Sequence, residues 1–428
     1  VDLPEDDDEM LGYKVGAELI KQAASKLNKV AGDGTTTVTV LTYNILKEAN
    51  RLIAAGHNPM ELKKGIEEAG REVVKGLDGL SESIEGKKER VAEVATISAG
   101  DELIGKLIAD VMDKVGKEGV ITVEAGQGLD MESEIVEGFN LDKGWASPFF
   151  VTDTNRQEAV YEKPSIVITD KKISTASELL PLIEKLAQAG KKDIVIVADD
   201  VDGEALSILV LNKLKGVLNT VVVKAPSFGD RRKDIMADMA VLTGAEVISE
   251  DKGLTFENAG LEVVGTARKV IVGKDDTTII EGAGHANEVK ARIAQIKAQA
   301  ENASSEYDKE QFEKRAAALS GKVAVIKVGG ATETEIDEKK FRVDDAVAAT
   351  KAALAEGIVA GGGVSLVNLA AQIKSDGADS VSAGRQILKQ ALKQPFLQIT
   401  VNAGLNSEAL LAQVEAAKPG VGVNVMNA

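Results

Sequence analysis

The chain has no cysteine, only two histidines and very few aromatic residues. The absence of cysteine excludes disulfides, zinc knuckles and thiol catalysis. The two histidines, His57 and His285, lie far apart in the sequence, so neither a histidine-based catalytic triad nor a histidine metal cluster is expected. Aromatic residues make up 3% of the chain, so the cores must be built mostly from Ala, Val, Ile and Leu.

Positive charge and long apolar runs are also scarce. Lys plus Arg number 51 against 68 Asp plus Glu, which gives a net charge of −17. An acidic surface of this kind repels nucleic acid and anionic membranes, and no basic stripe compensates for it. No apolar run approaches the length of a membrane span, and no signal peptide opens the chain. We therefore expect a soluble globular protein that binds neither nucleic acid nor membranes.

The order of the expected elements suggests one domain inserted into another. With 428 residues, the chain exceeds one ordinary core. Apolar spacings of three and four predict helices throughout 11–82, near 103–115 and again after 328. A highly charged pattern from 286 to 319 predicts a helical hairpin. The chain is thus helical at both ends and of mixed character in between.

The middle of the chain has the pattern of an α/β domain. Short β-branched runs alternate with helical stretches, which predicts a parallel sheet covered by helices. The runs are 166–169, 194–197, 220–223 and 246–248, and the helical stretches are 176–188, 203–215 and 233–243. Further strands are expected at 119–124, 269–272 and 323–328. This α/β domain would be the inserted one.

The most informative stretch is Ala31–Thr37, with the sequence AGDGTTT, between two helical patterns. Its turn delivers backbone N–H groups and three hydroxyls to the start of a helix, where anions are attracted. Asp33 would offer an oxygen ligand to Mg²⁺, which travels with nucleotide phosphates. Gly32 and Gly34 would let a polyphosphate approach the backbone closely. An Asp-Gly turn followed by a threonine helix cap satisfies the same local rules.

Two further groups of residues each allow two interpretations. Asp344 and Asp345 precede the helical pattern 346–355. They either form a simple charge cap at the helix N-terminus, or one of the two carboxylates orients a water molecule for phosphoryl hydrolysis. Ala360 and the three glycines 361–363 open the next helix. Consecutive glycines at a helix start are costly, so either a nucleotide or a tightly crossing helix should approach that backbone.

The two expected helices 176–188 and 203–215 are more apolar than one buried face requires. Such a surplus marks either a sticky surface or a deeply buried helix. Gly138 and Gly357 fall where the pattern changes class. They are either hinges that absorb backbone rotation or ordinary turn residues.

Taken together, these residues resemble the group I chaperonins, the GroEL-type ring-forming ATPases that fold other proteins. The resemblance runs over essentially the whole chain. It is carried by 31–37, 54–60, 113–124, 136–138, 224–226, 228–233, 277–280, 323–329 and 356–364.

The resemblance implies a subunit of three domains: a helical equatorial ATPase domain, a small α/β intermediate domain and an inserted α/β apical domain. The implied boundaries are 1–83 and 357–428 for the equatorial domain, 84–137 and 323–356 for the intermediate domain, and 138–322 for the apical domain.

The resemblance also assigns residue roles. Asp33 is similar to the Mg²⁺ ligand, and Asp345 to the catalytic aspartate that activates water. The implied nucleotide contacts are Gly34, Thr35, Thr36, Thr37, Ser98, Gly362, Asn424, Val425 and Met426. The residues that match the positions gripping non-native chains are Trp145, Phe149, Phe150, Leu180, Ile183, Leu206, Val210 and Leu211.

The function that the resemblance implies is an ATP-dependent chaperone. Its cofactors would be ATP and Mg²⁺, with K⁺ as an optional further ion. Its partners would be non-native polypeptides, a GroES-like co-chaperonin lid and further copies in heptameric, stacked rings. We expect a bacterial-type cytoplasmic protein, with an organellar matrix or stroma as the alternative.

The family's N-terminal and C-terminal equatorial segments are missing from this sequence, so we expect a fragment. Val425-Met426 also replaces smaller residues, and Trp145 stands where tyrosine is common. The alternative function is therefore a passive holdase that binds unfolded chains without effective ATP turnover.

Overall fold

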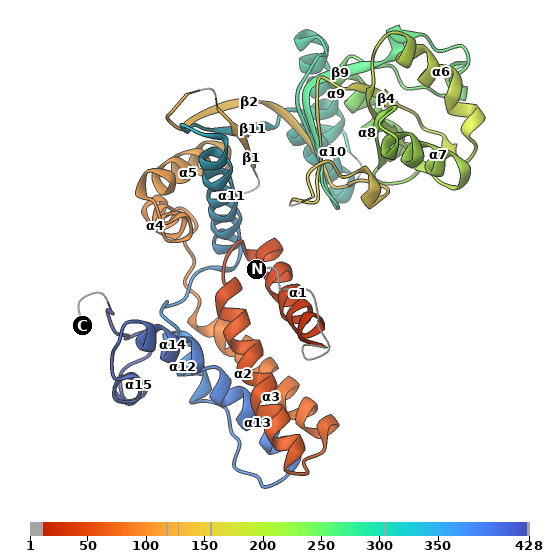
Figure 1. Cartoon of the computed structure of the whole chain (residues 1–428). Helices are drawn as coiled ribbons and strands as arrows, with labels where there is room; N and C mark the ends of the chain where they lie inside the picture. Colours follow the sequence, from red (N-terminus) through yellow and green to blue (C-terminus); the bar gives the residue numbers. More distant parts are fainter. Residues whose placement is uncertain (1–11, 117–118, 127, 155, 304, 426–428) are drawn as a thin grey trace. The chain divides into compact units, whose positions relative to one another are not determined.

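The chain folds into two compact units, which Figure 1 colours along the sequence. The computed structural model describes residues 12–116, 119–126, 128–154, 156–303 and 305–425. The helical unit comprises Val1–Lys117, Ala125–Asp130 and Val328–Ala428, and the sheet unit comprises Glu118–Glu124 and Met131–Lys327. The helices of the expected intermediate domain thus cluster with the helical unit, and its strands with the sheet unit. The finer three-domain boundaries stay a prediction.

The helical unit is built from two groups of helices separated by the sheet unit in the sequence. The first group is α1 (Tyr13–Ala31), α2 (Thr35–Ala54), α3 (Pro59–Leu80), α4 (Lys88–Ala99) and α5 (Glu102–Val115). The second is α11 (Glu333–Glu356), α12 (Val364–Ala370), α13 (Ser380–Ala391), α14 (Gln394–Asn402) and α15 (Ser407–Ala416). The helices predicted over 11–82, near 103–115 and after 328 are confirmed.

Helices α3 and α13 cross at unusually close range because each contributes a glycine. A Cβ on Gly65 would lie 2.0 Å from the carbonyl oxygen of Val381, and one on Gly384 would lie 2.2 Å from that of Leu62. Leu62 is itself fully buried. This crossing joins the two sequence-distant halves of the unit around a core of Ala69, Val73, Leu369 and Leu388.

Nine strands of the described chain form the main sheet of the sheet unit. They are β1 (Val120–Ala125), β2 (Glu132–Leu141), β3 (Ala159–Glu162), β4 (Ser165–Ile168), β6 (Asp193–Ala198), β8 (Asn219–Lys224), β9 (Gly265–Val272), β10 (Thr277–Gly282) and β11 (Lys322–Val328). Their order is β1-β11-β2-β10-β9-β4-β6-β8, with β3 also paired to β9. A small parallel pair, β5 (Lys172–Ile173) and β7 (Asp200–Val201), lies outside this sheet.

The predicted parallel sheet is confirmed for β4, β6 and β8. Their β-branched residues form the centre of the core, where Ile166, Ile196 and Val222 are almost fully buried. The helices of this unit are α6 (Ala176–Gln188), α7 (Gly203–Leu214), α8 (Gly229–Thr243), α9 (Ala286–Glu301) and α10 (Glu306–Leu319). The last two are the predicted hairpin. Three short 3-10 helices, η1 (Pro148–Phe150), η2 (Glu250–Lys252) and η3 (Leu261–Val263), complete the unit.

The strand predicted at 246–248 is wrong. Only one bridge forms there, between Ile248 and Thr169, with the Ile248 N–H donating to the Ile168 carbonyl at 2.9 Å. The sequence pattern also missed β2, β3, β10 and α4. Glutamates at 132, 134 and 137 and a glycine at 138 dilute the apolar pattern of β2, which pairs antiparallel with both β10 and β11.

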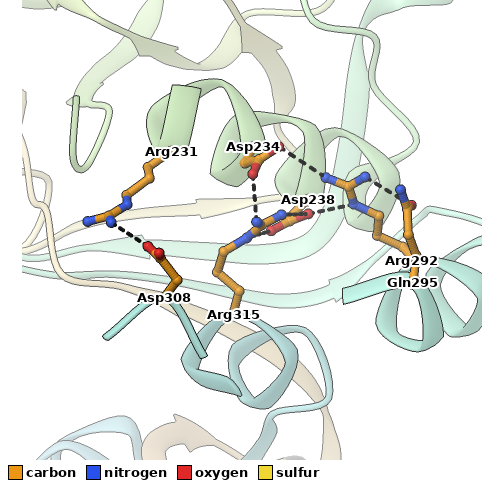
Figure 2. Close-up of polar contacts among 7 residues, drawn as sticks. All are labelled: Arg231, Asp234, Asp238, Arg292, Gln295, Asp308 and Arg315. Carbon is orange, nitrogen blue, oxygen red and sulfur yellow. Dashed lines mark hydrogen bonds and ion pairs between the residues drawn. The ribbon is translucent and has the colours of Figure 1, made fainter. Parts of the chain in front are cut away.

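A buried ion network ties the hairpin α9–α10 to α8, as Figure 2 shows. Asp238 of α8 has a side chain that is only 2% exposed. It accepts hydrogen bonds from Nε of Arg292 at 2.7 Å and from Nε and Nη2 of Arg315 at 2.7 and 3.0 Å. Asp234, one turn earlier, accepts from Nη1 of Arg315 at 2.7 Å. Two carboxylates and two guanidinium groups thus balance each other, with Asp238 buried and Asp234 partly exposed at the edge of the network.

Removal of one partner should leave two buried guanidinium groups unbalanced. Asp238→Ala is expected to lower the unfolding free energy of the sheet unit by about 3–5 kcal/mol. The matched control is Asp251→Ala, which removes an exposed ion pair to Lys233 of the same helix and should cost less than about 1 kcal/mol. Urea unfolding followed by the fluorescence of Trp145, the single tryptophan, measures both. Equal losses in the two variants would contradict the role of the network.

Candidate functional site

The loop before α2 has the backbone that its two glycines predict. Gly32 ends α1 with a φ of 61°, and Gly34 precedes α2 with a φ of 80°, both in the left-handed region. Asp33 lies exposed between them, and the Gly34 N–H donates to its Oδ1 at 2.6 Å. The turn thus presents a carboxylate directly in front of the N-terminus of a 20-residue helix.

The N–H groups in the first turn of α2 have no side-chain acceptor among the described residues. The N-cap residue is Gly34, and among the described residues no side chain caps this helix start. The threonine cap considered from the sequence is therefore not formed. Thr36 and Thr37 are exposed, and Thr35 is half-buried. Unpaired N–H groups at a helix N-terminus, together with free hydroxyls, are suited to bind an anion such as a phosphate.

The same loop packs directly against helix α11 (Figure 1). A Cβ on Gly32 would lie 2.4 Å from the backbone carbonyl oxygen of Asp345 and 2.6 Å from the Cβ of Ala348. Only glycine permits this approach, because real Cβ atoms do not come so near to backbone oxygen. The contact brings Asp33 and Asp345, which lie 312 positions apart in the sequence, to one place in the helical unit.

Asp345 lies half-buried in the middle of α11. Nδ2 of Asn28 donates to its Oδ1 at 3.4 Å. Burial raises the pKa of the Asp345 carboxyl above the usual range, the Asn28 hydrogen bond opposes this rise, and the negative charge of Asp33 adds to it. The two carboxylates therefore interact electrostatically. Asn28 was missed from the sequence, and its only signal was its place in the last turn of α1.

The charge-cap interpretation of Asp344 and Asp345 is wrong. Helix α11 begins at Glu333, where the Thr332 hydroxyl accepts from the Glu335 N–H at 3.2 Å. The two aspartates thus lie about three turns inside the helix, far from the N–H groups that a cap would satisfy. Their position is set by packing against the Gly32 loop and not by the dipole of a helix end.

The chemistry of this cluster fits Mg²⁺ bound together with phosphate. Among the residues that the structure describes, no three His, Cys, Asp or Glu side chains come together as a complete metal site. Each of the two carboxylates raises the electrostatic attraction of the place for a divalent cation. Mg²⁺ is commonly held by one or two carboxylates, with water and substrate phosphates as the other ligands. Asp33 would be the direct ligand in such an arrangement.

The glycines 361–363 were predicted to face either a nucleotide or a tightly crossing helix, and the structure gives different answers for Gly362 and Gly363. Gly363, the N-cap of α12, has a φ of 77°, and a Cβ on it would lie 2.7 Å from the backbone nitrogen of Phe396. This glycine therefore serves tight packing against α14. Gly362 has a φ of 65° and nothing within 4 Å of its Cβ position. Its exposed backbone leaves room for a ligand.

The C-terminal segment runs beside this glycine turn. The Gly420 N–H donates to Oδ1 of Asn368 at 3.0 Å, and a Cβ on Gly422 would lie 2.7 Å from Cγ2 of Val364. Asn424 and Val425 follow this segment in the sequence, and their contact with a nucleotide stays a prediction. Met426 lies outside the described residues. Ser98 is half-buried on α4, a helix that packs against α11.

The two hinge candidates have different surroundings. Gly357 has a φ of 84° and lies where two connecting segments cross, with Glu82 and Ile358 joined by reciprocal backbone hydrogen bonds of 2.8 and 2.9 Å. Gly138 is buried inside β2, where a Cβ would lie 2.2 Å from Cγ2 of Val323. This close packing explains why a glycine occupies position 138, and the backbone of Gly138 is part of the strand. Its role as a hinge stays a prediction.

The apolar surplus of α6 and α7 is partly exposed. Phe149 is 61% exposed in η1, and Leu180 and Leu211 are exposed on α6 and α7, two helices that contact each other. Trp145, Leu206 and Val210 are half-buried against the core. We call these six residues the apolar surface. Leu214, one of the apolar residues counted in the predicted surplus of this helix, is also exposed at the end of α7. Val217, just beyond the helix, is exposed too and was not singled out from the sequence.

Two of the residues predicted to bind clients are corrected by their burial. Phe150 is 0% exposed and Ile183 only 9%, so both side chains belong to the core. In η1, Phe149 points outward while its neighbour Phe150 packs inward, a difference that the sequence Phe-Phe does not reveal. Within the described residues, no helix combines the length and apolarity that a membrane crossing requires.

The comparison with protein families agrees with this architecture. The model of the TCP-1/cpn60 chaperonin family matches residues 13–428, which is nearly the whole chain. The chain belongs to this family. It is therefore a chaperonin-type chaperone of mixed helical and α/β fold, concerned with the folding of other proteins.

The contact between Gly32 and α11 can be tested by substitution. Gly32→Ala should lower stability by about 1–2 kcal/mol through left-handed backbone strain and by about 1–3 kcal/mol more through overpacking against α11. The matched control is Gly100→Ala, at another helix end with a φ of 66° and nothing within 4 Å of its Cβ position. This control should show only the backbone cost. Thermal unfolding by far-UV circular dichroism compares them, and equal costs would contradict the close contact.

Proposed function

We propose that this chain is the subunit of an ATP-driven chaperonin, with Mg-ATP bound at the Gly32–Thr37 loop. The observation that carries the proposal is the approach of Gly32 to the Asp345 backbone, because it unites an anion-binding helix start with two carboxylates. Phosphoryl hydrolysis requires mainly positioning and charge stabilisation, and these groups can supply both.

Each group has a role in this proposal. The N–H groups and hydroxyls of Thr35, Thr36 and Thr37 bind the phosphate oxygens, and Asp33 holds Mg²⁺. The bound ion would neutralise charge that develops on the phosphate. Asp345 accepts a proton from the attacking water, a task for which its raised pKa makes it a stronger base. Gly362, Ser98, Asn424, Val425 and Met426 are the proposed contacts to the rest of the nucleotide, with K⁺ as an optional ion.

The proposed client site is the apolar surface on α6, α7 and η1. Unfolded chains expose apolar side chains, and a large exposed apolar patch offers them a place to bind. We propose that a co-chaperonin lid competes for this surface and that the subunits form stacked heptameric rings. ATP would shift the population of ring states and so release the bound chain. A bacterial-type cytoplasmic location is proposed from the resemblance alone.

The role of Asp345 predicts a separation of binding from turnover. Asp345→Asn should lower the ATP hydrolysis rate constant by about 10²–10⁴-fold, the usual contribution of a general base. Nucleotide affinity should change little, because phosphate and metal are held by the α2 loop. Phosphate release and equilibrium binding of a fluorescent ATP analogue measure the two quantities. The control is Asp337→Asn, at an exposed position of the same helix. Unchanged turnover in Asp345→Asn would remove Asp345 from this role.

The apolar surface predicts a second separation, between binding and stability. Leu211→Ser should weaken capture of a chemically unfolded protein by about fivefold, because burial of a leucine contributes about 1.5–3 kcal/mol when complete. The fold should stay intact, since Leu211 is 48% exposed. Phe150→Ser should instead destabilise the sheet unit by about 3–5 kcal/mol.

Suppression of aggregation measures client capture, and tryptophan fluorescence measures the fold. Val74→Ser, at an exposed site on α3 of the helical unit, is the matched control for loss of an exposed apolar side chain. Normal capture by Leu211→Ser together with Leu180→Ser would contradict the proposed client surface.

A further inference from the structure

A cavity lined by lysines lies in the sheet unit, apart from the residues discussed so far. It has a volume of about 250 Å³ and lies where β4 and β6 begin. Three lysines line it: Lys163 ahead of β4, and Lys191 and Lys192 ahead of β6. Small-molecule sites usually measure about 300–1,000 Å³, so this cavity suits a compact ligand.

Within the part of the chain that the structure describes, the three lysines have no ion-pair partner. All are exposed, and none of them forms an ion pair with any described residue. The chain as a whole carries a net charge of −17, so a concentration of unpaired positive charge stands out against it. Repulsion among neighbouring ammonium groups disfavours such a cluster unless an anion joins it.

Two hydroxyl groups in the cavity lining are suited to the same ligand chemistry. Ser165 is only 4% exposed and lines the cavity from the start of β4. Its hydroxyl is not among the buried side-chain atoms that lack a partner in the described chain, so it remains accessible from the cavity and can donate to a bound acceptor. Thr266, opposite Ser165 in the pairing of β4 with β9, adds a second hydroxyl to the lining. Two hydroxyl donors are thus available to a bound acceptor.

The position of Lys163 is held by an unusual backbone. Its φ is 49°, in the left-handed region that residues other than glycine seldom adopt. The Lys163 N–H donates to the carbonyl of Arg268 at 2.9 Å, and Pro164 follows it. These constraints hold the lysine at the rim of the cavity.

The donor set favours phosphate over carboxylate. No arginine is among the lining residues, so the planar fork that matches a carboxylate is missing. Lysine binds a tetrahedral phosphate as a point charge, and hydroxyls complete its hydrogen bonds. One acidic residue, Asp193, also lines the cavity, but its Oδ1 already accepts from Nδ2 of Asn219 at 2.7 Å. The lining keeps a surplus of positive charge.

We propose that this cavity binds a small phosphate-bearing molecule, held by Lys163, Lys191 and Lys192 with Ser165 as a hydroxyl donor. The site lies in the sheet unit, whereas the Gly32–Thr37 loop lies in the helical unit. It needs no metal ion, because the lysines supply the charge. The proposal is independent of ATP hydrolysis and stands if the nucleotide site fails its own test.

The first experiment uses inorganic tripolyphosphate as the probe, on the full chain and in the presence of EDTA. Lysines are labelled with an acetylating reagent, and the modification of each is followed by mass spectrometry. Tripolyphosphate should slow labelling of Lys163, Lys191 and Lys192 several-fold and leave Lys297, an exposed lysine on α9, unchanged. Equal labelling of all four lysines with and without the probe would overturn the proposal. Citrate at the same concentration is the carboxylate comparison, and equal protection by citrate would overturn the choice of phosphate.

The second experiment compares variants whose charge changes have opposite effects. Lys191→Gln and Lys192→Gln should each weaken tripolyphosphate binding about two- to fivefold, as expected for loss of one exposed charge. Asp193→Asn keeps the acceptor for Asn219 and should strengthen binding by a similar factor. Lys297→Gln is the control with no expected effect. Unchanged affinity in all of the first three variants, measured by isothermal titration calorimetry with EDTA, would contradict the site.

Discussion

The approach of the Gly32 backbone to helix α11 decides where the candidate site forms. A side chain at this position would collide with the Asp345 carbonyl, so the loop could not lie where it does. The contact sets the position of Asp33, of the open N–H groups of α2 and of the Asp345 carboxylate together. Electrostatics then follows from packing, because burial and the nearby Asp33 charge both raise the pKa of Asp345. The absence of a Cβ at Gly32 is therefore a precondition of the proposed nucleotide site.

The two units differ in how they are held together. The helical unit uses close glycine contacts between helices, as at Gly65 against the Val381 backbone and at Gly384 against the Leu62 backbone. The sheet unit has a large apolar core, and it adds the buried network of Asp238, Arg292 and Arg315 beneath its helical hairpin (Figure 2). An ion network of this kind specifies one arrangement of three helices more than it adds stability. The glycine contacts and the ion network each depend on a few residues held at short distances.

Local patterns predicted most of the helices and the parallel strands, because apolar spacing reports the face that each element buries. They failed where contacts between distant parts of the chain determine the position of an element or the direction of a side chain. Helix α11 was expected to start after Asp345, since its first three turns are too polar for a periodic pattern, and only the structure shows the aspartates inside it. The glycine loop at Asp33 was recognised from its residues, whereas Asn28 was not, because its role depends on a helix 317 positions away. Phe149 and Phe150 carry the same side chain and differ only in direction.

Strand β2 belongs to two ladders at once, and this has a mechanical consequence. Residues 132–137 pair with β11, and residues 138–141 pair with β10, so the partner changes at Gly138. The Gly138 N–H is itself bonded to the Gly321 carbonyl at 3.1 Å. A bend at this glycine would have to break hydrogen bonds of one ladder or the other, so the pairing of β2 opposes rotation at the point where its partner changes.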